Sequence, residues 1–226
     1  MITPRQGSLA FAATALLFLI YPLLRPYVDE STLDGLRSFG TWSWIAAHLA
    51  AVLGFILLPL GLLALNASRT AFLLTWLGVG LTLPYYGAEV FGLHAIGEQT
   101  LTSGTTALSG MVDQIRYNPA AATMFLLGLL LIAAGTITTA VDVWHTATSP
   151  KWSAIPFAAG FALFIPQFFT PAPFRIAHGV LIAAGCAWLA VELRRSTATP
   201  RAPHAGTRPA AQSSPQRPGP LAPAPE

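Results

Sequence analysis

The apolar stretch at residues 71–97 constrains the fold more than any other feature of this sequence. A helix rises about 1.5 Å per residue, so about 20 apolar residues are enough to cross the hydrocarbon core of a bilayer. The stretch also contains Glu89, and a carboxylate within a membrane span is costly and usually faces protein or a water-filled cavity. The sequence therefore predicts a membrane-spanning helix that presents a polar group to a protein-lined site.

Five further apolar stretches indicate that the chain crosses the membrane six times. The predicted spans are residues 8–24, 42–65, 71–97, 120–144, 152–169 and 174–193. The composition agrees, because 54% of the residues are hydrophobic and only 9% are charged, whereas a soluble domain carries about 25% charged residues. We therefore predict an all-α, polytopic membrane protein, a six-transmembrane-helix bundle formed by residues 1–193 and surrounded by the lipid bilayer.

Residues 194–226 have a different character, since they are rich in proline and arginine and show no apolar periodicity. Such a segment does not bury enough apolar surface to offset the entropy lost on ordering it. We predict that it is a disordered tail. The rest of the chain has no basic face interleaved with aromatic residues, so we predict no nucleic-acid partner, and protein partners stay open.

The distribution of lysine and arginine predicts the orientation, because cytoplasmic loops carry an excess of basic residues. With the N-terminus inside, the inner segments hold eight of them: Arg5, Arg69, Lys151, Arg194, Arg195, Arg201, Arg208 and Arg217. The outer segments hold four: Arg25, Arg37, Arg116 and Arg175. Both termini are therefore predicted to be cytoplasmic. The preference for arginine over lysine and the abundance of alanine are typical of GC-rich coding, which favours a bacterial plasma membrane.

In this topology most polar residues of the spans fall in the outer half of the membrane. They are His48, Tyr85, Tyr86, Glu89, His94, Gln167, Arg175 and His178. Pro84 precedes Glu89 and is expected to kink the third helix at this level. We predict an outward-facing polar pocket, with candidate ligand- or proton-binding residues His48, Tyr85, Glu89, Arg175 and His178. Arg175 is the first candidate for a cationic partner of Glu89, with His48 and His178 next.

The chemistry of this pocket has three interpretations, and the sequence leaves all three open. The first is binding of a small ligand, an ion or a proton, with a link to transport. The second is a metal- or haem-dependent enzyme or redox protein, because His48, His94 and His178 are candidate zinc ligands and paired histidines can ligate haem. The third is a structural or assembly factor, whose polar residues only hold helices together. No catalytic residue is assigned, since neither HExxH nor Glu-x-x-His occurs.

The loop from residue 98 to residue 119 carries one short apolar stripe. Leu108, Met111, Val112 and Ile115 are spaced i, i+3, i+4 and i+7, which is the spacing of one helix face. About eight residues are too few to cross a bilayer, so we predict a short helix that lies in the membrane interface.

The second and third spans resemble the fourth and fifth in outline. In each pair the connection holds a basic residue, Arg69 or Lys151, and the second helix holds a late proline, Pro84 or Pro166. A parallel internal duplication and a chance similarity between apolar helices both account for this pattern.

Overall fold

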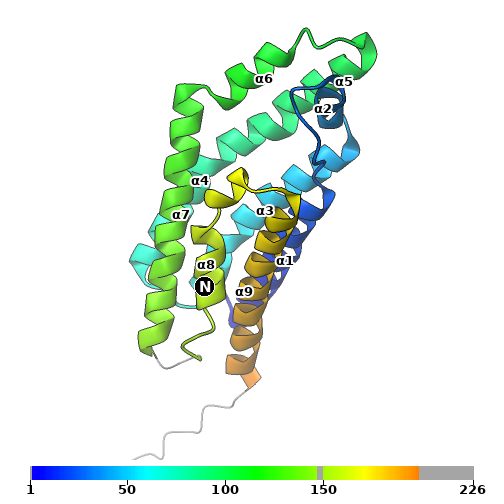
Figure 1. The fold of residues 1–226 in the computed structure, drawn as a ribbon. Helices are drawn as coiled ribbons and strands as arrows, with labels where there is room; N and C mark the ends of the chain where they lie inside the picture. The colour runs from blue at the N-terminus through cyan, green and yellow to red at the C-terminus, as the bar shows by residue number, and fades with distance from the viewer. Residues whose placement is uncertain (1, 147–149, 199–226) are drawn as a thin grey trace, which may run out of the picture.

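The computed structural model describes residues 2–146 and 150–198, and within these ranges the chain is helical and forms no strand. In chain order the elements are α1 (Pro4–Leu24), α2 (Leu33–Phe39), α3 (Trp42–Ala64), α4 (Arg69–Gly87), η1 (Ala88–Gly92), α5 (Leu93–Ser103), α6 (Ser109–Arg116), α7 (Pro119–Thr146), α8 (Ile155–Ala162), η2 (Pro166–Phe169) and α9 (Ala172–Ala198). The element η1 is a π-helix and η2 is a 3-10 helix. Together they form an elongated helical bundle (Figure 1), which confirms the all-α prediction.

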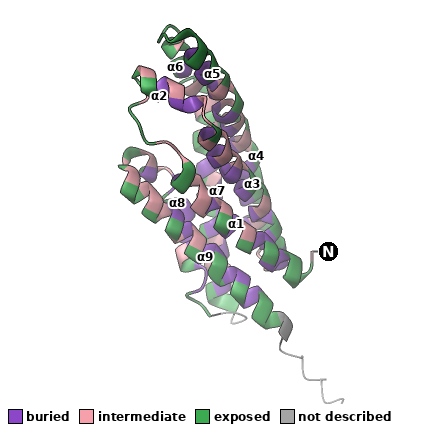
Figure 2. Ribbon diagram, turned by 90° about the vertical axis from the view of Figure 1, so that its right-hand side faces the viewer, coloured by how far each residue is buried: buried purple, intermediate pink, exposed green. Residues whose placement is uncertain are grey.

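Five helices of the described residues are long and apolar enough to cross a membrane. They are Pro4–Leu24, Trp42–Ala64, Arg69–Ser103, Pro119–Thr146 and Ala172–Ser196. Large apolar side chains such as Leu16, Leu53 and Leu130 are exposed on these helices, and the exposed residues follow the outer sides of the bundle (Figure 2). Helices that are apolar on their outward as well as their inward faces suit a lipid environment.

The predicted fifth span, residues 152–169, is not one long helix. It consists of α8, which has only eight residues, then a turn, and then η2. Pro166 contributes to the interruption, because proline has no N–H to donate to the carbonyl of Ala162, where α8 ends. The described residues therefore contain five long helices where the sequence predicted six.

The other boundaries differ from the prediction by a few residues. Helix α9 continues to Ala198, so the first residues of the predicted tail are helical, and residues 199–226 lie outside the described ranges. The third long helix extends beyond the predicted 71–97, because α4, η1 and α5 follow one another from Arg69 to Ser103. The short helix predicted around residues 108–115 is present as α6.

Hydroxyl side chains cap the N-termini of four helices. Thr3, Thr32, Thr41 and Ser68 each accept a hydrogen bond from the backbone N–H three residues further on. Each of these caps satisfies one of the free N–H groups at the start of a helix. The beginnings of α1, α2, α3 and α4 are therefore determined by their own local sequence.

The long helices that pack in pairs, α1 with α3 and α9, and α4 with α7, run antiparallel and define two ends of the bundle. At the terminal end α1 begins, while α3 and α9 finish, so that a Cβ added to Gly7 would meet Ala64 and Leu193. Helix α4 begins and α7 finishes at the same end, where the backbone N–H of Ser68 donates to Asp142 Oδ2 at 2.9 Å. The opposite end, where α3 and α9 begin, is called the distal end below.

An aromatic core joins α1, α3 and α8. Phe11, Phe18, Phe55, Phe157 and Phe161 are almost or completely buried there. Phe18 packs edge to face on Phe55 with ring centroids 4.9 Å apart. Such pairs contribute about 1 kcal/mol beyond the burial of their area, and they fix the helices without any polar contact.

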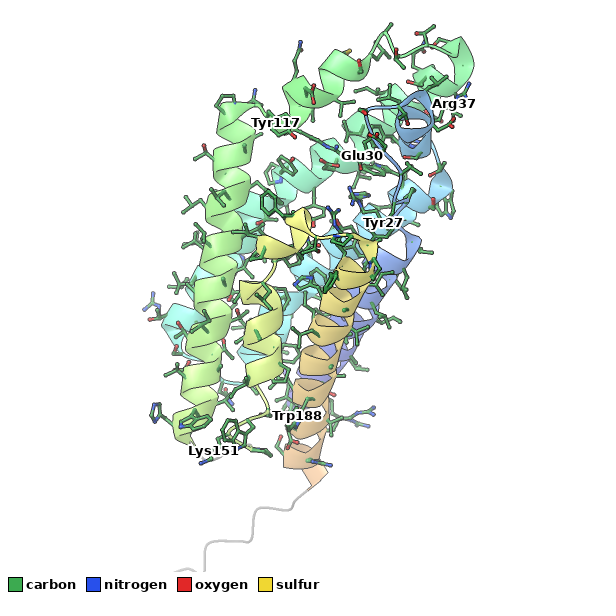
Figure 3. The ribbon with its side chains drawn as sticks, viewed as in Figure 1. Tyr27, Glu30, Arg37, Tyr117, Lys151 and Trp188 are labelled. Atoms are coloured by element: carbon green, nitrogen blue, oxygen red, sulfur yellow. The ribbon has the colours of Figure 1, made fainter. Side chains whose placement is uncertain are left out.

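Helices of unequal length leave space at the distal end. The helix from Arg69 to Ser103 has 35 residues, about 52 Å at 1.5 Å per residue, whereas α1 has 21 residues, about 32 Å. The long helix therefore extends past the end of α1, and α2 and α6 pack on this extension around a second apolar core that includes Phe39, Leu93 and Val112. In Figure 3, Glu30 and Tyr117 lie toward this distal end, while Lys151 and Trp188 lie toward the terminal end.

Small residues allow the backbones of α4 and α7 to approach closely. A Cβ added to Gly128 would lie 2.4 Å from Thr82 Oγ1 and 2.7 Å from the carbonyl oxygen of Gly78. A Cβ added to Gly135 would lie 2.2 Å from Thr75 Oγ1. Helices in lipid associate through this kind of van der Waals packing, because the apolar surroundings give them no hydrophobic drive to associate.

Gly128→Ala should force α4 and α7 apart and lower the free energy of unfolding by about 1–3 kcal/mol, the usual cost of overpacking. Gly80→Ala is the matched control, since it is the same change within α4 and nothing lies within 4 Å of the added Cβ. The midpoints of thermal unfolding in detergent measure both effects. Equal midpoints for the two variants would contradict the close approach of the helices.

Candidate ligand-binding cavity at the distal end

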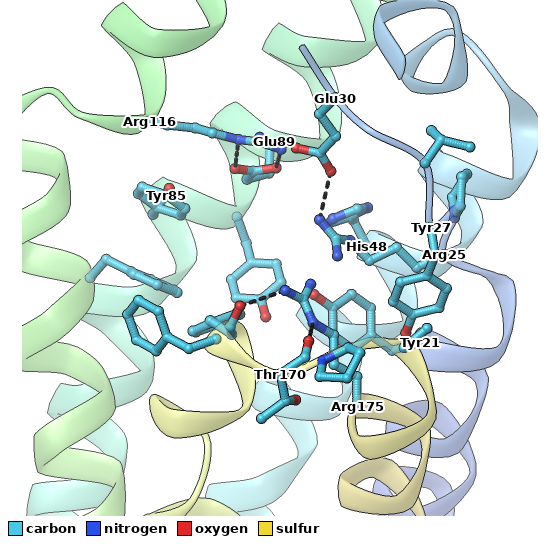
Figure 4. A pocket seen from close by; sticks show the side chains of 18 of the residues that line it. Tyr21, Arg25, Tyr27, Glu30, His48, Tyr85, Glu89, Arg116, Thr170 and Arg175 are labelled. Carbon is cyan, nitrogen blue, oxygen red and sulfur yellow. Dashed lines mark hydrogen bonds and ion pairs between the residues drawn. The ribbon is translucent and has the colours of Figure 1, made fainter. Parts of the chain in front are cut away.

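A cavity of ≈ 680 Å³ lies at the distal end, within the range of volumes of small-molecule sites. Its wall combines aromatic and charged side chains from several helices (Figure 4). The polar lining residues are Tyr21, Arg25, Tyr27, Glu30, His48, Tyr85, Tyr86, Glu89, Arg116, Tyr117, Thr170 and Arg175. Four of the five predicted ligand-binding residues are thus among those that line this cavity: His48, Tyr85, Glu89 and Arg175.

Glu89 lies on the π-helical turn η1, between α4 and α5. In this turn the N–H of Leu93 donates to the carbonyl of Ala88, five residues earlier. A π turn inserts an extra residue into a helix and occurs frequently at functional sites. The carbonyl of Glu89 accepts a hydrogen bond from Trp44 Nε1 at 2.8 Å, which ties the turn to α3. Pro84, predicted to kink the helix, lies inside α4 one turn before η1.

Two arginines and two glutamates form an ion network above the cavity. Arg116 Nε and Nη2 donate to the two carboxylate oxygens of Glu89 at 2.8 and 3.1 Å, and Arg116 Nη1 also donates to Glu30. Arg25 Nη2 donates to the other oxygen of Glu30 at 2.9 Å. The predicted pairing of Glu89 with Arg175 is therefore wrong, because Arg116 occupies both oxygens of Glu89.

Arg116 joins three parts of the chain through this network. It lies on α6, Glu89 lies on η1, and Glu30 lies in the loop between α1 and α2. Burial lowers the pKa of Arg116, but the charges of Glu89 and Glu30 act more strongly in the opposite direction, so its pKa is raised. The guanidinium is thus held in its charged form, and α6 is fixed over the cavity.

Sequence reasoning missed Arg25, Glu30 and Arg116 as site residues. Each lies in a polar connection between predicted spans, where charged residues are ordinarily solvated. One feature of the sequence pointed to Arg116, which directly follows the short apolar stripe. A helix that packs its apolar stripe on the bundle also brings the polar side chains beside that stripe close to the bundle.

Arg175 lies on the opposite side of the cavity and is held by backbone groups. Its Nε donates to the carbonyl of Thr170 at 2.9 Å and its Nη2 donates to the carbonyl of Phe168. Among the described residues no carboxylate lies within 4.0 Å of its guanidinium. Figure 4 shows this guanidinium in the cavity, facing the ion network.

His48 presents a hydrogen-bond acceptor to the cavity. Its Nδ1 lies 2.8 Å from the carbonyl oxygen of Trp44, and a carbonyl only accepts, so Nδ1 carries the proton. The other ring nitrogen, Nε2, is therefore the one with a lone pair. The residue is 2% exposed, and its ring packs on that of Trp44 with centroids 4.1 Å apart.

Tyr85 and Tyr86 provide an aromatic wall and a hydroxyl that lies near Tyr21 without a hydrogen bond of normal geometry to it. Tyr85 stacks on Phe125 of α7 with ring centroids 4.2 Å apart. Tyr86 is 3% exposed, and its buried hydroxyl makes no hydrogen bond of normal length and angle with any described residue. Leaving a buried hydroxyl unsatisfied costs about 1–3 kcal/mol, so this group is expected to meet a polar occupant of the cavity.

The remaining candidate histidines lie elsewhere. His178 Nε2 approaches the carbonyl of Gly160 at 2.7 Å, in a narrow side pocket that it shares with Gln167. His94 Nδ1 lies 2.9 Å from the carbonyl of Phe39. In residues 2–146 and 150–198 no three His, Cys, Asp or Glu side chains form a metal-binding group. The candidate metal ligands His48, His94 and His178 therefore do not form one site in the described part of the chain.

Known proteins offer no guide to the cavity. No protein-family model, no curated protein and no solved structure matches this chain. The interpretation of the cavity therefore depends on its own geometry and charges.

Glu89 and Arg116 should be energetically coupled. Arg116→Gln should lower the free energy of unfolding by about 3 kcal/mol, because it leaves the Glu89 carboxylate buried and unpaired. Glu89→Gln should lower the free energy of unfolding by less, because Arg116 keeps its ion pair with Glu30. The double variant should recover at least about 1 kcal/mol of the combined loss, as measured by a double-mutant cycle in detergent.

A second cycle, with Arg175→Gln in place of the Arg116 variant, is the control. Arg175 donates to backbone carbonyls and not to Glu89, so its coupling to Glu89 should be close to zero. A larger coupling of Glu89 to Arg175 than to Arg116 would contradict the ion network described above.

Proposed function

We propose that this protein is a multi-pass protein of a bacterial plasma membrane that binds a small ligand in the distal cavity. The observation that carries the proposal is unused hydrogen-bonding capacity at the cavity wall. Within the described residues Nε2 of His48 makes no hydrogen bond, and the Tyr86 hydroxyl, which lies near Tyr21, makes none of normal length and angle. Buried polar groups are almost always satisfied in native proteins, so these two are suited to a ligand that offers polar atoms.

The proposed topology has six crossings, with α8 and η2 together as a broken fifth crossing. Both termini are cytoplasmic and the distal end faces outward, because the terminal end carries most of the basic residues. Glu89 lies 20 residues after Arg69, the first residue of α4, which is about 30 Å along the helix. This length equals the thickness of the hydrocarbon core, so the cavity lies at the level of the outer head groups.

Cysteine labelling tests this orientation. In a variant that lacks the native Cys186, a cysteine at Ser103 should react with a membrane-impermeant thiol reagent on intact cells. A cysteine at Arg69 should react only after the cells are permeabilised. Both positions are exposed on the protein, so accessibility depends on the side of the membrane. The reverse labelling pattern would overturn the outward-facing cavity.

A cavity-filling substitution tests ligand binding. Ala172 lines the cavity, and Ala172→Trp should displace whatever the purified protein retains. Ala177→Trp is the matched control, because Ala177 is exposed on the same helix. Extracts of the wild type and both variants, purified in mild detergent, are compared by mass spectrometry.

The expected result is a compound that is present in the wild type and in Ala177→Trp and at least about tenfold depleted in Ala172→Trp, since one blocked pocket removes the whole contact area. Both variants must retain the wild-type unfolding midpoint within a few degrees. Identical extracts from all three proteins would overturn the proposal.

A further inference from the structure

The charges that line the cavity do not balance. Three arginines and two glutamates face it, and both glutamates are already paired with Arg116 and Arg25. Arg175 is the arginine left without a carboxylate in the described part of the chain. The cavity therefore carries one uncompensated positive charge.

Arg175 is also oriented in advance. Its two bonds to the carbonyls of Phe168 and Thr170 use one edge of the guanidinium, and no bond within the described residues uses Nη1. An arginine held in this way loses little conformational entropy when it binds an anion. Its free edge is suited to a carboxylate or phosphate oxygen.

The wall beside Arg175 is apolar and reaches the outside of the bundle. Phe125 and Phe168 line the cavity with ring centroids 5.8 Å apart. Phe169 lines it as well and is 85% exposed, so the cavity adjoins a surface on which an apolar chain can lie. A polar pocket with an apolar wall that continues to the outside of the bundle is suited to a ligand that is itself partly apolar.

We infer that the ligand is an amphiphile with a single negative charge, whose carboxylate or phosphate contacts Arg175 and whose apolar part lies along Phe125, Phe168 and Phe169. This inference rests on the proposed function of the cavity. The Tyr86 hydroxyl then donates to an oxygen of the head group, and His48 Nε2 accepts from a hydroxyl of the head group where it carries one, as in phosphatidylglycerol. Such a ligand comes either from the soluble phase, as a fatty acid, or from the bilayer, as an anionic phospholipid.

The soluble source is tested with octanoate, which is compared with octanol and with acetate at equal concentration. Thermal unfolding in a neutral detergent should show stabilisation by octanoate and little or none by octanol or acetate. Arg175→Gln should weaken octanoate binding at least about tenfold, the usual effect of losing a hydrogen bond to a charged group. Arg175→Lys should restore part of the affinity.

Arg37→Gln is the matched control, because Arg37 pairs with the exposed Asp34 and neither residue lines the cavity. It should bind octanoate as the wild type does. The unfolding midpoint of each variant without ligand shows whether Arg175→Gln has damaged the fold, and Arg175→Lys keeps the test valid if it has.

The lipid source is tested by the ratio of phosphatidylglycerol to phosphatidylcholine that copurifies from mixed micelles, as measured by mass spectrometry. A preference for phosphatidylglycerol that falls about tenfold in Arg175→Gln supports the inference with a lipid ligand. Stabilisation by octanoate without that preference supports it with a soluble ligand.

The remaining outcomes overturn the inference. If octanol stabilises the protein as much as octanoate does, the ligand needs no negative charge. If acetate stabilises it as much as octanoate does, the ligand needs no apolar part. No preference for any anion, together with a neutral compound displaced by Ala172→Trp, overturns the inference but leaves the proposed function standing. If Ala172→Trp also displaces nothing, both fail.

Discussion

The contact on which the distal end depends is the bond between the guanidinium of Arg116 and two carboxylates. Arg116 reaches Glu89 on η1 and Glu30 in the loop after α1, so one side chain connects three segments that are far apart in sequence. Removing one partner of a buried pair leaves an uncompensated charge, which is the costly state. The position of α6 over the cavity is therefore tied to these two ion pairs.

The cavity itself results from a difference in helix length. A long helix that contains a π turn continues past the end of α1, and the interrupted segment of α8 and η2 ends beside the start of α9. Side chains that would otherwise be solvated then face inward beneath α6. An apolar bundle with helices of equal length would have packed this space with hydrocarbon, as the aromatic core around Phe18 is packed. The polar wall is thus a consequence of the architecture as well as of the residues.

Much of the fold could be predicted from the sequence because lipid imposes a simple requirement. Apolar length alone located five long helices to within a few residues, apart from the extension of the third to Ser103. The broken fifth segment was harder to predict, since hydropathy does not report that the α-helix ends at Ala162 and that η2 begins at Pro166. Glu89, His48 and Arg175 could be chosen as candidates because polar groups within spans are rare. The partners of these residues could not be predicted, because hydropathy indicates how deep a residue lies in the membrane but not the direction in which its side chain points.

The π turn is one reason why the directions of the side chains could not be predicted. In a regular helix each residue turns about 100°, so a single inserted residue rotates everything after it by about that angle. His94 follows the turn and contacts the carbonyl of Phe39, whereas Glu89, at its start, faces the cavity. Glu89 binds Arg116, whereas His94 holds α5 against α2. Arg116 thus occupies the carboxylate of Glu89, and Arg175 is the arginine of the cavity that has no carboxylate partner among the described residues.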